Sequence, residues 1–257
     1  MSMLANQRRE KILELIREDG HAKVLDLSRI FKVTEVTIRQ DLERLEKEGL
    51  IRREHGGAVL IDIDAGVRNI TLQNQNNNVS EKMAIARKAI SFVKNGDTII
   101  LDSGSTTTEI AKLLLDFQNI TVITNALNIA LILGAYPHIN LFVTGGEFKA
   151  PTLSLTGQKA ADSFNNLNAD KLFLATAGIS LKAGLTYPSI SDICVKRAMI
   201  ESANEVFLVA DSSKIGLNSF ASLGALSLVN LLITDSNIAQ EHKDMLESNE
   251  IAYVLAE

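Results

Sequence analysis

The chain has 257 residues, which exceeds the usual size of a single domain, so we expect two domains. Hydrophobic residues make up 46% and charged residues 22%, as in a soluble globular protein, and no apolar run approaches the roughly 18 residues that a membrane span needs. One cysteine, Cys194, excludes an intramolecular disulfide framework, and the four scattered histidines give no local metal motif.

The net charge of −5 is distributed unevenly along the chain. Residues 1–60 carry 12 Lys and Arg against 11 Asp and Glu, whereas the remainder carries 14 against 20. The negative net charge of the whole chain therefore does not exclude a nucleic-acid partner for the charge-dense first segment. The polar N-terminus lacks the apolar region of a signal peptide, so we expect a cytoplasmic protein without a membrane partner.

Two short amphipathic helices are predicted at the start of the chain. In residues 5–19, Ile12 and Ile16 share one side, and charged residues such as Arg8 lie largely off it. Apolar residues recur at helical spacing again within residues 23–31, which predicts the second helix.

A third helix follows after a short turn. Thr34 is a suitable N-cap for this helix, which we expect to run to about Glu48 and to end before Gly49. Ile38 and Leu42 fall within one narrow apolar stripe, and the opposite face is polar. The third helix therefore presents a polar surface at its N-terminal end.

Residues 50–59 predict a small β-hairpin with glycines at its bend. Three short helices followed by a basic hairpin form a winged helix-turn-helix, in which the third helix enters the major groove of DNA. A merely solvated charged surface is the alternative, but the helix spacing and the hairpin together favour DNA binding. The residues that we expect to contact DNA are Thr34, Glu35, Val36, Thr37, Arg39, Gln40, Arg44, Arg52, Arg53, His55 and Gly56.

Residues 60–79 lack a sustained hydrophobic period and contain a polar tract, which predicts a linker. The linker is either a passive tether or a segment that transmits effector binding to the DNA-binding heads, and its composition does not distinguish the two. We therefore expect a winged helix-turn-helix domain over residues 1–59, the linker over 60–79 and an effector domain over 80–257.

From Ser80 onward, short apolar strands alternate with helices. Ser80 is expected to cap a helix that ends near Val93. The alternation predicts an α/β domain with a mostly parallel sheet covered by helices. The predicted strands are residues 99–101, 120–123, 140–143, 171–175, 206–210 and 231–234.

The stretch from Thr98 to Leu115 places a loop of hydroxyl residues between a strand and a helix. We expect Gly104 to take a positive φ, which lets successive N–H groups turn toward one point at the N-terminus of the following helix. Such a loop binds anions, and a phosphorylated small molecule fits this chemistry. The alternative is that Thr106 and Glu109 only form a helix capping box.

Polar residues and glycines recur directly after the predicted strands. In open α/β sheets this carboxyl edge is where ligands bind, so we expect these residues to converge on one site for a phosphorylated sugar. Taken singly, each has a structural explanation, such as a helix cap at Asn125 or a turn at Gly145. The expected effector-binding residues are Asp102, Ser103, Gly104, Ser105, Thr106, Thr107, Thr124, Asn125, Gly145, Gly146 and Lys214.

Two groups of motifs carry a resemblance to a known family. Residues 31–59, from F-K-V-T-E-V-T-I-R-Q-D-L to H-G-G-A-V, resemble the DNA-binding signature of the DeoR family of bacterial transcriptional regulators. The later motifs L-D-S-G-S-T-T-T, I-T-N-A-L, V-T-G-G-E and V-A-D-S-S-K-I-G resemble that family's sugar-phosphate effector domain. The chain departs from the family at Gln40, where a second arginine is common, and at Ser105, where threonine is common.

The resemblance implies a repressor of a sugar catabolic operon that a phosphorylated sugar releases, with an effector domain like ribose-phosphate isomerase. Catalysis is the alternative, and isomerases of this kind carry a carboxylate-rich D-G-A-D segment after a central strand. The corresponding stretch here, Leu172 to Ile179, contains no carboxylate, so we expect binding without turnover, cofactor or metal. A third alternative, a structural oligomerisation module, would lack an effector pocket.

One small winged head reads a short site, so we expect two copies on repeated or palindromic operator DNA, in a homodimer or homotetramer. Glutamine suits adenine where arginine suits guanine, so Gln40 predicts an operator different from those of arginine-bearing relatives. The sequence does not identify the sugar, whose shape we expect to be selected by Lys149, Tyr187, Lys196 and Arg197.

Overall fold

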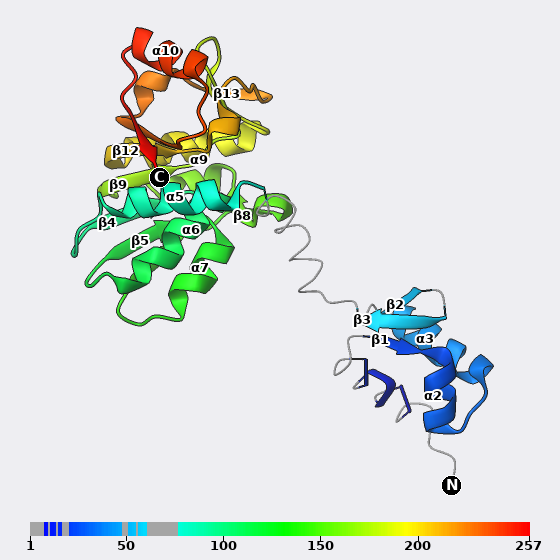
Figure 1. Cartoon of the computed structure of the whole chain (residues 1–257). Coiled ribbons are helices and arrows are strands. Elements are labelled where there is room, and N and C mark those ends of the chain that lie inside the picture. Colours follow the sequence, from blue (N-terminus) through cyan, green and yellow to red (C-terminus); the bar gives the residue numbers. More distant parts are fainter. Residues whose placement is uncertain are drawn as a thin grey trace. The chain divides into compact units, whose positions relative to one another are not determined.

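The computed structural model describes residues 8–9, 11–13, 15–16, 21–47, 51–54, 56–60 and 77–257 (Figure 1). The chain divides into two compact units, residues 1–70 and 71–257. Both units contain clusters of buried hydrophobic side chains. No helix within the described ranges is long and apolar enough to cross a membrane.

The amino-terminal unit packs helices against a small antiparallel sheet. The described residues between positions 8 and 16 are helical, as predicted. Apolar side chains from the helices and the sheet form the core, including Ile12, Leu27 and Ile38, which are at most 1% exposed. The other elements are α2 (Val24–Phe31), α3 (Glu35–Lys47), β1 (His21–Lys23), β2 (Ile51–Glu54) and β3 (Gly57–Leu60), with sheet order β1-β3-β2.

Polar side chains cap α3 and join it to the first helix in this unit. Thr34 caps α3 as predicted, because its Oγ1 accepts a hydrogen bond from the Thr37 amide at 3.2 Å. Arg8 was expected largely off the apolar side of the first helix, and the structure adds that it is buried, with its Nε paired with the buried Asp41 carboxylate at 2.6 Å. The predicted hairpin corresponds to β2 and β3, and β1 adds a third strand that was not predicted.

The carboxy-terminal unit is built on a seven-stranded sheet in which every pairing is parallel. This confirms the predicted α/β fold with a mostly parallel sheet. The central strands are buried apolar runs, as expected where helices cover both faces. In spatial order the strands are β15 (Tyr253–Ala256), β14 (Leu231–Asp235), β12 (Ala203–Val209), β9 (Ala169–Leu174), β4 (Thr98–Leu101), β5 (Thr121–Thr124) and β6 (Asn140–Val143).

Helices cover both faces of this sheet (Figure 1). The first helix begins at Val79 instead of being capped by Ser80, because Asn78 takes a left-handed φ of 57° and its carbonyl accepts from the Lys82 amide. One face is covered by α5 (Val79–Ile90), α6 (Ser105–Leu113) and α7 (Leu127–Gly134), and the other by α8 (Gln158–Asp162), α9 (Ile190–Glu201) and α10 (Gln240–Ser248).

Smaller elements extend from the carboxyl edge of the parallel sheet. An antiparallel pair joins β7 (Glu147–Lys149) to β8 (Ser154–Thr156). A three-stranded antiparallel sheet contains β10 (Gly178–Ser180), β11 (Gly184–Tyr187) and β13 (Ala221–Gly224). Short 3-10 helices lie at Leu114–Asp116, Ala150–Thr152, Ser212–Lys214 and Leu226–Leu228.

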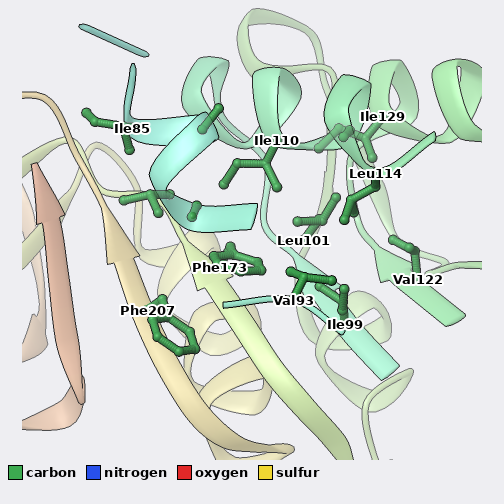
Figure 2. Packing of buried hydrophobic residues seen from close by; sticks show 14 of the residues in the cluster. Ile85, Val93, Ile99, Leu101, Ile110, Leu114, Val122, Ile129, Phe173 and Phe207 are labelled. Atoms are coloured by element: carbon green, nitrogen blue, oxygen red, sulfur yellow. The ribbon is translucent and has the colours of Figure 1, made fainter. Parts of the chain in front are cut away.

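Two hydrophobic clusters lie on opposite faces of the sheet. Successive strand residues point to opposite sides, so Ile99 and Leu101 enter one cluster while Ile100 enters the other. Figure 2 shows the first cluster, in which Phe173 of β9 stacks on Phe207 of β12 with ring centroids 5.4 Å apart. This packing holds the central strands whose ends form the site described below.

Replacing Phe173 with alanine should lower the free energy of unfolding by about 3–5 kcal/mol, because the side chain is fully buried and its removal leaves a cavity. Urea unfolding of the whole chain, followed by circular dichroism, measures this change. Phe220 is 79% exposed, so Phe220→Ala should change it by no more than about 0.5 kcal/mol. Equal stabilities of the two variants would contradict the packing.

Candidate functional site

The strand order reverses between β4 and β9, near the middle of the seven-stranded sheet. From β4 the chain adds β5 and β6 on one side, and it then places β9, β12, β14 and β15 on the other. In open α/β sheets, ligands bind in the crevice at the carboxyl ends of the strands where the order reverses. The loops that follow β4 and β9 therefore lie where a ligand is expected.

A cavity of about 620 Å³ opens at this edge of the sheet. Small-molecule sites span about 300–1,000 Å³, so the cavity is large enough for a compact ligand. Loops and helices that follow several different strands contribute to its wall. Its polar lining residues are Asn77, Asn78, Lys82, Ser103, Ser105, Thr106, Lys149, Thr152, Thr176, Tyr187, Asp192, Lys196, Asp211, Ser213 and Lys214.

Asp102 lies behind the cavity wall and positions Lys196. Its fully buried carboxylate accepts hydrogen bonds from the amides of Ser103 at 2.6 Å and Ala175 at 3.1 Å, and also from Lys196 Nζ. Burial raises the pKa of Asp102, and the Lys196 ammonium opposes this shift. Lys196 Nζ also lies 5.7 Å from the centroid of the Tyr187 ring. Asp102 therefore orients a cation at the cavity, and it does not itself line the cavity, although we expected it to contact the effector.

Gly104 precedes α6 and shapes the loop differently from the prediction. Its φ of 176° is extended backbone, so the expected positive φ is wrong. A glycine is required because a Cβ at this position would lie 2.8 Å from the Ala175 Cβ. The capping-box alternative is also wrong, because α6 begins at Ser105 and Gly104, not Thr106, occupies the N-cap position.

The first turn of α6 forms part of the cavity wall. The amides of Ser105 and Thr106 donate no hydrogen bond to any other described residue, and both residues line the cavity. The hydroxyls of Thr107 and Thr108 instead donate to the Gly104 carbonyl, at 3.0 and 2.7 Å. An anion at this end would therefore meet free N–H groups and the partial positive charge of the helix N-terminus.

Two lysines lie at the side of the cavity formed by α5 and the end of β12. Lys82 of α5 donates to the Asn77 carbonyl at 2.6 Å. Burial lowers the pKa of Lys82, and the Asp211 carboxylate opposes this shift. Asn78 donates from its Nδ2 to Asp211 at 2.9 Å. Lys214, which follows β12, is half-buried. Lys82 and Lys214 thus bring two ammonium groups to this side of the cavity.

Lys149 enters the cavity on the antiparallel pair of β7 and β8. Its Nζ forms an ion pair with the Asp192 carboxylate of α9 at 2.6 Å. Asn125, at the end of β5, holds this pair of strands: its carbonyl accepts from the Leu155 amide at 2.7 Å, and its Nδ2 donates to the Leu155 carbonyl at 3.0 Å. Asn125 is fully buried and does not line the cavity, although we expected it to contact the effector.

Other residues of the expected effector site support the fold around the cavity. Thr124 Oγ1 donates to the Leu101 carbonyl at 2.8 Å, which ties β5 to β4. Gly146, at φ 130°, packs where a Cβ would lie 2.7 Å from the Thr156 carbonyl oxygen. Thr107, Thr124, Gly145 and Gly146 do not line the cavity, whereas Ser103, Gly104, Ser105, Thr106 and Lys214 do.

Several lining residues were not among the predicted effector contacts. The sequence around Lys82 does not indicate a ligand contact, because this residue reaches the cavity only through the packing of α5. Asp211 directly follows a predicted strand, and the rule that identified Lys214 could have found it. Of the residues expected to select the sugar's shape, Lys149, Tyr187 and Lys196 line the cavity, and Arg197 borders a separate hollow. Within the described ranges, no group of three or more His, Cys, Asp or Glu could hold a metal ion.

The expected DNA contacts lie on α3 and the β2–β3 hairpin. Val36 is 61% exposed, and Gln40 is also exposed. Arg39 donates to Glu35 at 2.8 Å, and Arg53 donates to Glu46 at 2.7 Å across to α3. The other described residues are Thr34 and Arg44, both exposed, Thr37, half-buried, and Gly56 at the bend with φ 84°. His55 and the side chain of Arg52 lie outside the described part of the chain.

Comparisons with known proteins match both units. Residues 8–64 match the DeoR-like helix-turn-helix domain, and residues 77–236 match the DeoR C terminal sensor domain. The chain is 39% identical to the uncharacterized HTH-type transcriptional regulator YulB of Bacillus subtilis (strain 168), over 97% of this chain and 96% of the relative. It is 32% identical to the glycerol-3-phosphate regulon repressor of Escherichia coli (strain K12), over 91% and 92%. Ribose 5-phosphate isomerase A of Methanocaldococcus jannaschii aligns with a TM-score of 0.40 and 18% identity, over 54% and 55%.

A helix-turn-helix unit and a sensor unit with a cavity at the switch point together define a ligand-responsive transcriptional regulator. The chain belongs to the DeoR family of transcriptional regulators. The expected DNA-binding regulator is therefore confirmed. The alternative of an isomerase is set aside, because both units match domains of regulators and the relatives over the whole chain are regulators.

Replacing Gly104 with alanine should lower the free energy of unfolding by about 1–3 kcal/mol, because the new Cβ overlaps the Ala175 side chain. Adding Ala175→Gly should restore most of the loss. Gly145→Ala is the matched control, since no atom lies within 4 Å of a Cβ there. Thermal unfolding compares the three variants, and equal effects of the two single substitutions would contradict the close contact.

Proposed function

We propose that the chain represses a sugar catabolic operon and that a phosphorylated sugar in the sensor cavity controls its binding to operator DNA. The free amides of Ser105 and Thr106 at the N-terminus of α6, in a cavity that also contains lysines, carry this proposal. Backbone N–H groups at a helix N-terminus are a suitable site for a phosphate, which carries about two negative charges near neutral pH.

The name of one relative, which aligns with most of the chain, also supports a phosphorylated ligand. The relative from Escherichia coli is named as a repressor of the glycerol-3-phosphate regulon, and glycerol 3-phosphate is a small polyol phosphate. A cavity of about 620 Å³ accommodates such a phosphate and also larger phosphorylated sugars. The proposal therefore specifies the phosphorylated class and not one sugar.

The proposed operator contacts come from α3 and the β2–β3 hairpin. Val36 and Gln40 are exposed on α3, where a recognition helix reads base edges, and arginines around them would neutralise phosphates. One winged head covers a short site, so two copies in a homodimer or homotetramer would read symmetric half-sites. In this proposal the operator is bound by a DNA-binding domain over residues 1–59 and the sugar by an effector domain over 80–257. A linker over 60–79 joins the two.

The proposed mechanism is linkage between two binding sites. The ligand releases operator DNA only if it binds more tightly to the arrangement of heads that does not fit the operator. Because the coupling is reciprocal, operator DNA weakens ligand binding by the same factor by which the ligand weakens operator binding. Relief of repression follows from this difference in affinity.

A thermal-shift screen over phosphorylated hexoses, pentoses, trioses and amino sugars tests the proposed effector. A ligand at about 100 times its Kd should stabilise the protein by about 2.7 kcal/mol and raise the Tm. Lys214→Gln should reduce this shift, because Lys214 faces the cavity, whereas Lys159→Gln on the exposed surface of α8 should not. The proposal fails if no phosphorylated sugar raises the Tm.

Selection of binding sites from a random DNA pool tests the proposed role of Gln40. The wild-type protein should favour adenine at the base that Gln40 contacts, and Gln40→Arg should favour guanine there, with about 1–3 kcal/mol of discrimination. Sequencing the selected pools measures both preferences. Indistinguishable preferences would remove Gln40 from the residues that read bases.

A further inference from the structure

Two residues near the end of the proposed linker, Asn77 and Asn78, line the sensor cavity. Both residues are exposed, and they directly precede α5. The proposed linker over residues 60–79 joins the two units in sequence. The segment that leads from the DNA-binding unit therefore ends in the wall of the cavity.

Three side chains of the cavity wall hold these two residues. Lys82 Nζ donates to the Asn77 carbonyl at 2.6 Å. Asn78 Nδ2 donates to the Asp211 carboxylate at 2.9 Å and to the Ser213 hydroxyl at 3.3 Å. All three of these partners line the same cavity, so a bound ligand lies beside the groups that fix the end of the linker.

Among these partners, Lys82 is the group that an anionic ligand would attract. Its side chain is buried, and burial lowers the pKa of Lys82, which the Asp211 carboxylate raises and the Lys214 ammonium lowers further. Helix α5 packs against α6, and the Glu109 carboxylate of α6 also raises the pKa of Lys82. Lys82 therefore lies within electrostatic range of the helix whose first turn is the proposed phosphate site.

We propose that Lys82 couples the cavity to the linker: an anionic ligand draws the Lys82 ammonium from the Asn77 carbonyl and releases residues 77–78 from the cavity wall. This rests on the proposed function, in which a phosphorylated sugar occupies the cavity. The linker is then a segment that transmits effector binding, and not a passive tether.

The two acceptors that compete for the Lys82 ammonium differ in charge. The Asn77 carbonyl is neutral, whereas a phosphate carries about two negative charges near neutral pH and forms the stronger hydrogen bond with a cation. The flexible four-carbon stem of a lysine lets its ammonium move between two acceptors without a shift of the backbone. Loss of the bond to Asn77 leaves the side chain of Asn78 to hold the end of the linker.

Operator binding with and without a phosphorylated sugar tests this coupling on the full chain. The DNA is a site selected from the random pool, and the probes are glycerol 3-phosphate, fructose 6-phosphate, glucose 6-phosphate and ribose 5-phosphate. Titration calorimetry identifies the probes that bind and their saturating concentrations, and fluorescence anisotropy gives the operator Kd. A probe that binds should change the operator Kd of the wild-type protein by about fivefold or more.

Two substitutions should affect this change in different ways. Lys82→Gln removes the ammonium, so its operator Kd should be nearly the same with and without a saturating probe. Asn78→Gly accepts the left-handed φ but removes the bonds to Asp211 and Ser213. Without any probe, Asn78→Gly should therefore shift the operator Kd in the direction in which the probe shifts the wild-type protein.

Two further variants separate the coupling from a general effect of charge or folding. Lys82→Arg keeps a cation on a long side chain and should retain most of the wild-type response to the probe. Arg87→Gln removes a cation from the exposed surface of the same helix, outside the cavity, and should change neither the operator Kd nor the response.

The outcomes distinguish this inference from the proposed function. Equal responses of the wild-type protein and Lys82→Gln, or an unchanged operator Kd in Asn78→Gly without a probe, would overturn the inference while the phosphorylated effector stands. If Lys82→Gln does not fold or binds no probe, Asn78→Gly decides alone. A wild-type protein that binds no probe, or that binds one without a change in operator Kd, would overturn the proposed function and this inference with it.

Discussion

The pairing of β4 with β9 is the constraint on which the sensor unit depends. Leu101 lies opposite Phe173 in this pairing, and the Asp102 amide donates to the Phe173 carbonyl at 3.1 Å. Just beyond the strands, the Ala175 amide donates to the Asp102 carboxylate. The strand order reverses here, so the N-terminus of α6, Lys196 and the loop after β9 meet at one cavity. The topology of the sheet therefore places the cavity, and with it the proposed phosphate site, at this point.

Features that depend on local sequence could be predicted. The central strands are buried on both faces, so they form continuous apolar runs, and the alternation with helices indicated a parallel sheet. Residues 103–106 and Lys214 were predicted correctly as neighbours, because each directly follows a strand and the carboxyl ends of parallel strands share one edge. The N-cap at Thr34 was predicted for the same local reason. What these residues bind stays a prediction.

Features that depend on contacts between distant residues could not be predicted. The Lys149–Asp192 pair joins residues 43 positions apart, and the Lys196–Asp102 pair joins residues 94 positions apart. Nothing near either residue in the sequence indicates its partner. Gly104 shows the same limit, because a close approach to Ala175, and not a positive φ, requires glycine there. Sequence patterns thus located the edge of the sheet that holds the site but not the charges that shape it.

The central claim is that a phosphate binds at the N-terminus of α6, beside the point where the strand order reverses. A crystal structure of the chain with a bound phosphorylated sugar tests it most directly. The account predicts phosphate oxygens within hydrogen-bonding distance of the Ser105 and Thr106 amides, with the sugar in the cavity that these residues line. A phosphate bound elsewhere, with these two amides covered by protein side chains, would contradict the account.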